Sequence, residues 1–208
     1  MTTAHAIGVP GDAARPAGAV RCVDALVAHL DAKGSAKYLY FWGHRPQRDG
    51  SVGTGCLSQW WPSPFTVDGV AHATAEHWMM AGKARLFGDT DAEERALAAP
   101  HPKAAKSVGR AVRGFDEEIW CRERYALVVQ GSVHKFRAHP DLRAFLAGTR
   151  RRVLVEASPL DRVWGIGLAA DDERAANPRS WRGLNLLGFA LMEARERLAA
   201  EDTAGAAE

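Results

Sequence analysis

The fold of this chain is decided by residues 59–87, which read QWWPSPFTVDGVAHATAEHWMMAGKARLF. We expect an extended segment, a tight turn, a second short strand and then a helix. Asp68-Gly69 predicts a two-residue hairpin turn, because a type I′ turn needs a positive φ at both central positions. Thr74 predicts the start of the helix, since its hydroxyl can accept a free backbone N–H, and Gly88 predicts its end just after Phe87.

Two charged residues of this helix share one face. Glu76 and Lys83 are seven residues apart, or nearly two turns, so their side chains are separated by about 10 Å along the axis. Between them the chain reads His-Trp-Met-Met. A carboxylate and an amine beside aromatic and thioether groups favour the lining of a pocket. The alternative is a surface pair too far apart for a salt bridge, next to an ordinary core stripe.

Composition excludes several classes of protein. The chain has 208 residues, of which 47% are hydrophobic and 25% charged, which is typical of one soluble globular domain. Its net charge of +2 is too balanced to predict nucleic-acid binding. No apolar run is long enough to span a bilayer, and the first residues do not resemble a secretory signal. The three cysteines lack a C-x-x-C pair and the eight histidines are scattered, so we expect no disulfide framework, no metal site and a cytoplasmic location.

Helical periodicity dominates the rest of the chain. We expect a disordered tail over 1–18, one domain over 19–200 and a frayed tail over 201–208, with short strands near residues 38, 57, 66 and 153. A last helix opens at Asn185, and its buried stripe is predicted to be Leu187, Leu191, Ala194 and Leu198. The predicted fold class is therefore α+β: a single compact, mostly helical domain with a few short strands.

Several polar and aromatic residues between these elements have two interpretations each. Trp164 lies beside glycines in D-R-V-W-G-I-G-L, where it either faces a ligand or plugs a tight turn. Asp172 either caps a turn or binds ribose hydroxyls. Asn185 either contacts the substrate or is simply a helix N-cap. The run 150–152 of three arginines is either solvated or binds phosphate.

Taken together, the motifs resemble one family. They are F-W-G near 41, S-Q-W-W-P-S-P-F near 58, T-A-E-H-W-M-M-A-G-K-A at 74, L-V-E-A-S-P at 154, D-R-V-W-G-I-G-L at 161 and W-R-G-L-N-L-L-G-F-A-L-M-E-A-R at 181. In this order, over residues 38–198, the chain resembles the NADAR, or YbiA-like, family. The resemblance implies a compact, largely helical α+β fold and an N-glycosidase. Its substrate would be ADP-ribosylated guanine in nucleic acid or a phosphoribosylamino intermediate of riboflavin synthesis.

The resemblance also implies a set of site residues. The family's T-x-E-H motif makes Glu76 the functional carboxylate, and its downstream lysine is Lys83. Where some members have an acid after W-G, this chain has Ile166, so Asp161 or Asp172 is expected to supply that carboxylate, with Asp161 assigned to catalysis. Substrate contacts are expected from Trp42, Gly43, His77, Trp164, Gly165, Asp172 and Asn185.

The expected chemistry suits these residue types. A carboxylate stabilises the oxocarbenium character that develops when an N-ribosyl bond breaks, or it activates water. An amine of lowered pKa could trap the ring-opened sugar as a Schiff base. The expected partner is a ribosyl or ADP-ribosyl small molecule, or ADP-ribosylated nucleic acid, with no cofactor and no membrane. The alternative function is a module that binds ADP-ribose or NAD without cleaving it.

Overall fold

The computed structural model describes residues 20–205, and its second pair of strands is the predicted hairpin. Strand β2 (Phe65–Val67) pairs antiparallel with β3 (Val70–His72). The φ angles of the two turn residues, Asp68 and Gly69, are 49° and 80°. Both are positive, so the type I′ prediction from the sequence is confirmed.

Helix α2 (Ala75–Leu86) follows this hairpin directly. The hydroxyl of Thr74 accepts a hydrogen bond from the backbone N–H of His77, as a helix N-cap does. The helix ends before Gly88, which has a φ of 69° and takes the left-handed conformation that favours glycine after a helix. Both predicted ends of this helix are therefore confirmed.

Six further α-helices lie within the described residues, and most of them have ends set by local capping. Asp116 caps the longest of them through the N–H of Ile119, and proline occupies the first turn of α4 and α6. Their bounds are α1 (Val23–Lys33), α3 (Thr90–Leu97), α4 (Pro102–Arg110), α5 (Glu117–Ala138), α6 (Pro140–Gly148) and α7 (Leu186–Gly205).

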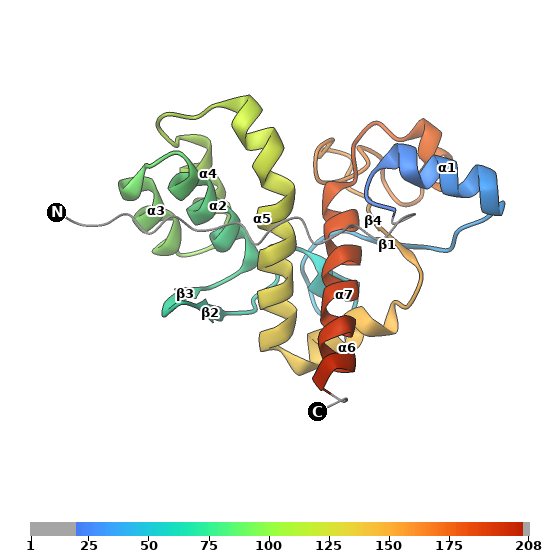
Figure 1. The fold of residues 1–208 in the computed structure, drawn as a ribbon, viewed down its shortest axis with the longest axis horizontal. Helices are drawn as coiled ribbons and strands as arrows, with labels where there is room; N and C mark the ends of the chain where they lie inside the picture. Colours follow the sequence, from blue (N-terminus) through green and yellow to red (C-terminus); the bar gives the residue numbers. More distant parts are fainter. Residues whose placement is uncertain (1–19, 206–208) are drawn as a thin grey trace.

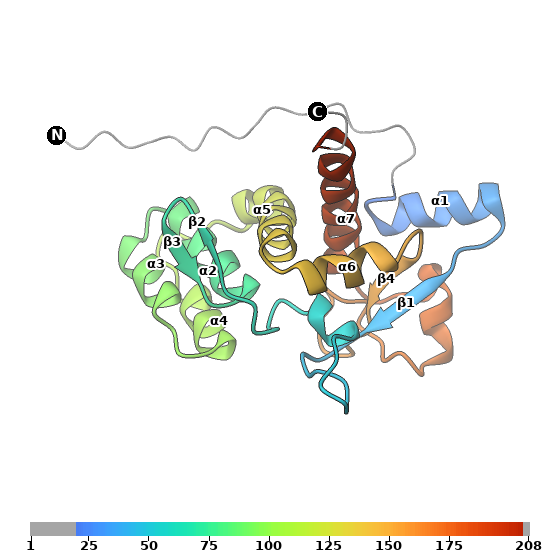
Figure 2. The same ribbon diagram turned by 90° about the horizontal axis from the view of Figure 1, so that it is seen from below.

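Helices α5 and α7 form the middle of the molecule (Figures 1 and 2). On one side of α5 lie α2, α3, α4 and the hairpin, and on the far side of α7 lie α1 and the other sheet (Figure 1). That sheet pairs β1 (Tyr38–Phe41) in parallel with β4 (Val153–Glu156). The parallel pairing brings the end of β1 next to the end of β4, although the two strands are more than a hundred residues apart in the sequence.

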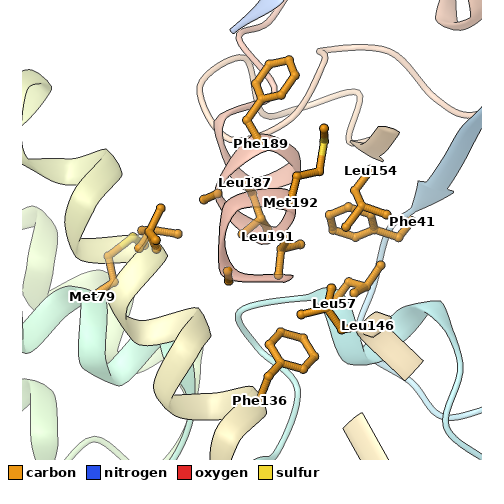
Figure 3. Packing of buried hydrophobic residues seen from close by; sticks show 14 of the residues in the cluster. Phe41, Leu57, Met79, Phe136, Leu146, Leu154, Leu187, Phe189, Leu191 and Met192 are labelled. Carbon is orange, nitrogen blue, oxygen red and sulfur yellow. The ribbon is translucent and has the colours of Figure 1, made fainter. Parts of the chain in front are cut away.

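The main core lies where α7 packs against these elements. Figure 3 shows Leu187 and Leu191 of α7 between Phe136 of α5 and Leu154 of β4, and Met79 of α2 approaches from the other side of α5. The stripe predicted for the last helix is buried throughout, at Leu187, Leu191, Ala194 and Leu198. The predicted α+β class, largely helical with few short strands, is confirmed.

The structure differs from the sequence expectations in one element. Near residue 57 a strand was expected, but Thr54–Leu57 forms a 3₁₀ turn, η1. Gly53 and Gly55 flank its first residue, and a side chain at Gly55 would collide with the carbonyl of Arg45 at 2.4 Å. The chain therefore bends where a strand would have run straight.

The expected tails lie partly outside the described residues. Residues 1–18 and 206–208, which the sequence analysis assigned to the two tails, are not among them. Residues 201–205, assigned to the second tail, are helical because α7 continues to Gly205. Two more 3₁₀ turns, η2 (Glu173–Ala176) and η3 (Pro178–Ser180), lie in the long connection between β4 and α7.

Candidate functional site

Glu76 is a buried carboxylate in the first turn of α2. It is 2% exposed, and its backbone N–H donates to the carbonyl of Gln59 at 3.0 Å. Its Oε1 oxygen is buried and finds no hydrogen-bond partner among the described residues. A buried polar atom without a partner costs free energy, so this oxygen marks a place where a ligand or a proton would be stabilised.

Glu156 is a second carboxylate of the same kind, at the end of β4. Its Oε2 oxygen is also buried and unpartnered within residues 20–205. Its carbonyl accepts the N–H of Ile166 at 2.9 Å. A Cβ on Gly165 would lie 2.8 Å from the carbonyl oxygen of Glu156 and 3.1 Å from that of Asp161. This close approach requires glycine at position 165. It brings the backbones of Glu156 and Asp161 close to each other on either side of Gly165.

The two glutamates are shifted toward their protonated forms. Burial raises the pKa of Glu76 to about 7, while Lys106 and the hydrogen-bonding side chain of Trp60 lower it and Asp161 raises it. Burial likewise raises the pKa of Glu156 to about 8, with further increases from Asp161 and from Glu76. Carboxyl groups on α2 and β4 therefore lie within electrostatic reach of each other, and near neutral pH Glu156 keeps its proton more readily than Glu76 does.

Cations of α4 accompany these carboxyl groups. Lys106 lowers the pKa of both Glu76 and Glu156, and Arg110 lowers that of Glu76. Lys106 is half-buried and Arg110 is exposed. Neither has a salt-bridge partner within the described part of the chain. Both cations are thus free to meet an anionic group at the mouth of the site.

The loop after β4 is anchored by Asp161 and Asn185. The Oδ1 oxygen of Asp161 accepts the N–H groups of Val163 and Trp164 at 2.9 and 2.7 Å. Asn185 is fully buried, and its amide donates to the carbonyl of Leu154 at 2.9 Å and accepts the N–H of Glu156 at 3.0 Å. Asn185 therefore holds the strand that carries Glu156, a more specific arrangement than an N-cap.

Trp164, Gly165 and Ile166 are neighbours in this loop. Trp164 is half-buried and packs against the main core. Ile166, where some relatives carry an acid, is fully buried in that core and cannot be replaced there by a charged group at low cost. Two aspartates were expected to supply the missing carboxylate. Of these, Asp161 raises the pKa of both glutamates, and Asp172 is not among the described groups that shift either pKa.

Two other predicted contact residues use their polar atoms within the protein. His77 is buried, with Nδ1 2.8 Å from the hydroxyl of Thr74 and Nε2 3.0 Å from the carbonyl of Ala99. Asp172 pairs with Arg174, whose backbone and side chain both donate to it and hold the pKa of this carboxyl well below its usual range. His77 ties α2 to the connection between α3 and α4, and Asp172 caps η2.

Lys83 lies toward the other end of α2. Its amine is 4.0 Å from the ring centroid of Phe115 and 5.3 Å from that of Trp120. Burial lowers the pKa of this amine, and Glu117 raises it. The described groups that shift the pKa of Glu76 do not include Lys83. A shared helix face thus leaves the two side chains in different surroundings, an aromatic one for Lys83 and a carboxylate one for Glu76.

Trp42 and Gly43 lie on an open part of the surface. The Trp42 side chain is 65% exposed, which leaves its ring free to stack on a ligand. With Gly43 and four neighbours it lines a hollow of about 240 Å³. His44, also in that lining, has its ring centroid 5.7 Å from the indole of Trp60. Since Trp60 also acts on Glu76, the hollow adjoins the carboxylate site.

Comparison with known proteins identifies the family. Residues 40–199 match the NADAR domain. The chain belongs to the NADAR domain family. It is 37% identical over 165 residues to an N-glycosidase of Acanthamoeba polyphaga mimivirus, covering 77% of this chain and 95% of that protein. It is 33% identical over 146 residues to an N-glycosidase of Nostoc punctiforme, covering 69% of this chain and 85% of that one.

A solved NADAR structure confirms the fold. The NMR structure of the E. coli protein YbiA superimposes with a TM-score of 0.64 and 27% identity, covering 81% of this chain and 89% of that one. The relatives named N-glycosidase confirm the expectation that this NADAR domain is an N-glycosyl hydrolase. Within residues 20–205 no helix has both the length and the apolar character of a membrane span.

Sequence reasoning missed Glu156 and Lys106 as members of this site. Glu156 is the third residue of the motif L-V-E-A-S-P, where a charged residue ends an apolar strand. A carboxylate at the end of a buried strand was the available signal. Lys106 has no such signal, because its approach to the carboxylates depends on how α4 packs against α2.

Proposed function

We propose that this NADAR domain hydrolyses the N-glycosidic bond of a phosphate-bearing N-ribosyl substrate, with Glu76 and Glu156 as its acid–base pair. The observation that carries the proposal is the pair of buried, unpartnered carboxyl oxygens on α2 and β4. Two carboxyl groups of raised pKa in one site supply the two roles that glycoside hydrolysis needs, one proton donor and one carboxylate.

Each glutamate has a distinct part in this reaction. Glu156, with the higher pKa, holds the proton and gives it to the leaving nitrogen as the bond to the anomeric carbon breaks. Glu76 remains ionised, stabilises the oxocarbenium character of the ribose and takes a proton from the attacking water. The water oxygen ends on the anomeric carbon. Asp161 keeps the pKa of both groups high through its negative charge.

The cations and aromatic rings favour a nucleotide-like substrate. Lys106 and Arg110 would pair with phosphate, which these residue types bind well. The exposed ring of Trp42 and the partly buried ring of Trp164 would stack on a base or sugar. ADP-ribosylated guanine in nucleic acid and a phosphoribosylamino-pyrimidine of riboflavin synthesis both have these parts. We propose the first or the second as the substrate.

Product analysis separates these possibilities. The protein is incubated with DNA that carries ADP-ribosylated guanine and, separately, with a phosphoribosylamino-pyrimidine, and the products are identified by mass spectrometry. We expect the wild-type protein, but not Glu76→Gln, either to release ADP-ribose from the DNA and restore unmodified guanine or to release the aminopyrimidine from the phosphoribosylamino-pyrimidine. If ADP-ribose raises the melting temperature but neither substrate is cleaved, the protein is a non-catalytic ADP-ribose binder and the proposal is wrong.

A further inference from the structure

A buried lysine of α5 has no part in the reaction described above. Lys135 is 1% exposed, and its Nζ donates to the carbonyl oxygens of Cys56 at 2.6 Å and Ser58 at 2.8 Å. These acceptors are 79 and 77 residues away in the sequence. Burial of an amine is costly, and it lowers the pKa of Lys135 to about 7. An apolar side chain would fill this space at a lower cost in free energy. The two hydrogen bonds of Lys135 therefore indicate a role beyond packing.

The two carbonyl groups belong to the segment 54–61, which continues into the site. The Oγ of Ser58 accepts the backbone N–H of Trp60 at 3.1 Å. The carbonyl of the next residue, Gln59, accepts the N–H of Glu76 at 3.0 Å. The side chain of Trp60 acts on the carboxyl group of Glu76. Lys135 therefore binds one part of this segment, and the residues that follow directly in the chain bind Glu76.

The segment has little other regular structure to hold it. It consists of the single 3₁₀ turn η1 and the residues that follow, and it pairs with no strand. Its carbonyl groups at 56 and 58 point at α5, the longest helix of the protein, which is packed on both sides. A rigid donor on that helix can set the position of the segment to within a hydrogen-bond length.

We propose that Lys135 is a positioning residue, which fixes the segment 54–61 and thereby the place of Gln59 and Trp60 against Glu76. The inference rests on the proposed role of Glu76 in catalysis. Lys135 itself does not contact the substrate. It acts by keeping Trp60 and the carbonyl of Gln59 where they orient the carboxylate, and small errors in such placement reduce the rate of reaction strongly.

The test replaces Lys135 with methionine, which has a similar length and no donor. Hydrogen exchange is measured without substrate for the amides of Cys56, Ser58, Trp60 and Trp61, all of which are hydrogen-bonded in this segment. We expect Lys135→Met to speed exchange there by at least about tenfold relative to β4, and to lower kcat by at least about tenfold, because a misplacement of about 1 Å can cost about 100-fold. The pKa of Glu76, followed by carbon-13 NMR, should rise as Trp60 is released.

The matched control is Val128→Ala, on the same helix. Val128 is fully buried and belongs to the main core, so its truncation weakens the packing of α5 and removes no hydrogen-bond donor from the segment. We expect similar loss of overall stability, an unchanged pKa of Glu76 and an unchanged kcat. If Lys135→Met behaves like this control, with exchange raised uniformly and kcat preserved, Lys135 serves packing alone and the inference is wrong.

A second variant decides the matter if Lys135→Met fails to fold. Lys135→Gln keeps an N–H donor but is shorter than lysine, so it cannot hold both carbonyl groups at their present distances. It should speed exchange at Cys56, Ser58 and Trp60 relative to β4 and raise the pKa of Glu76, and unchanged values for both would overturn the inference. Exchange and the pKa are read without substrate. Failure of the wild-type protein to cleave any N-ribosyl substrate would therefore refute the proposed function separately.

Discussion

Burial of the Glu156 carboxyl group costs free energy, and the same burial lets this group hold the proton that the reaction needs. An ionised carboxylate that is buried without a full set of partners is unstable, and the group responds by keeping its proton. Glu76 meets the same condition on the opposite side of the site, and each negative charge makes the other more costly. Because Glu156 has the higher pKa of the two, it can donate a proton while Glu76 accepts one.

Replacement of either glutamate tests this division of roles. Glu156→Gln and Glu76→Gln keep the shape of the side chain and remove the titrating oxygen, so each should lower kcat by at least about 100-fold, the scale of acid–base catalysis. Glu94→Gln, at an exposed position of α3, is the matched control and should leave kcat unchanged. Turnover of Glu156→Gln within a few-fold of wild type would mean that another group protonates the leaving nitrogen.

The alternative to direct attack by water is a covalent mechanism, in which Lys83 is the nucleophile. Its amine lies against the ring of Phe115, and its pKa is lowered by burial, which favours the neutral form that attacks a ring-opened ribose. Borohydride added during turnover should then leave a reduced sugar adduct on the peptide that contains Lys83, detectable by mass spectrometry. Lys83→Arg should lose adduct and turnover together. An active Arg variant without an adduct would show that the position needs positive charge alone.

At the scale of elements, the loop after β4 and the start of α7 form one unit. The carbonyl groups of Val163, Trp164 and Gly165 accept the N–H groups of residues 186, 187 and 185. The N–H groups that a helix start would offer to a phosphate are thus already bound. Phosphate recognition therefore falls to side chains such as Lys106 and Arg110, as proposed above.

Asn185 is the residue that joins this unit to β4, and its removal should destabilise the fold. Asn185→Ala leaves the N–H of Glu156 and the carbonyl of Leu154 buried without partners, at a cost of about 1–3 kcal/mol for each group. We expect the free energy of unfolding in urea to fall by about 2–4 kcal/mol. Asn177→Ala, an exposed asparagine that accepts one backbone N–H, is the control and should cost about 1 kcal/mol. Equal losses would contradict a structural role for Asn185.

The elements also show which features a sequence can predict. The turn at Asp68-Gly69, the Thr74 and Asp116 caps and the buried stripe of α7 are local, because each depends on residues within a few positions. The parallel pairing of β1 with β4 and the hydrogen bonds from Lys135 to residues 56 and 58 join distant segments, and no local pattern encodes them. The strand expected near 57 failed for a related reason, since the bend there depends on contact between Gly55 and Arg45.

At the scale of the whole molecule, the candidate site joins parts that lie on either side of the central helices. Glu76 comes from α2, on one side of α5, and Glu156 from β4, beyond α7 (Figure 1). The resemblance of motifs gave Glu76, Asp161 and Asn185 before the structure, because each lies in a short distinctive stretch. Glu156 and Lys106 join the site only because β4 and α4 pack near α2. Composition and periodicity do not predict that packing.

The same two carboxyl groups predict how the stability of the molecule depends on pH. Their pKa values are raised in the folded state from 4.5 to about 7 and about 8, so the folded protein binds more protons than the unfolded chain between pH 4.5 and 8. Stability is therefore lost as the pH rises through this window, by about 1.4 kcal/mol for each pH unit over which one group stays protonated. His72 and Lys135 act in the opposite direction, because burial lowers their pKa values to about 4 and about 7.

A double variant isolates the contribution of the glutamates. Glu76→Gln combined with Glu156→Gln removes both titrations, while His72 and Lys135 remain and cancel in the difference from wild type. The difference in unfolding free energy between variant and wild type should therefore shift in favour of the variant as the pH rises from 4.5 to 8. It is measured by urea unfolding at several pH values and checked against the exposed Glu94→Gln control. Parallel curves across this range would mean that the two carboxyl groups ionise in the folded protein as easily as in water. Neither could then hold the proton that cleavage of the N-glycosidic bond requires.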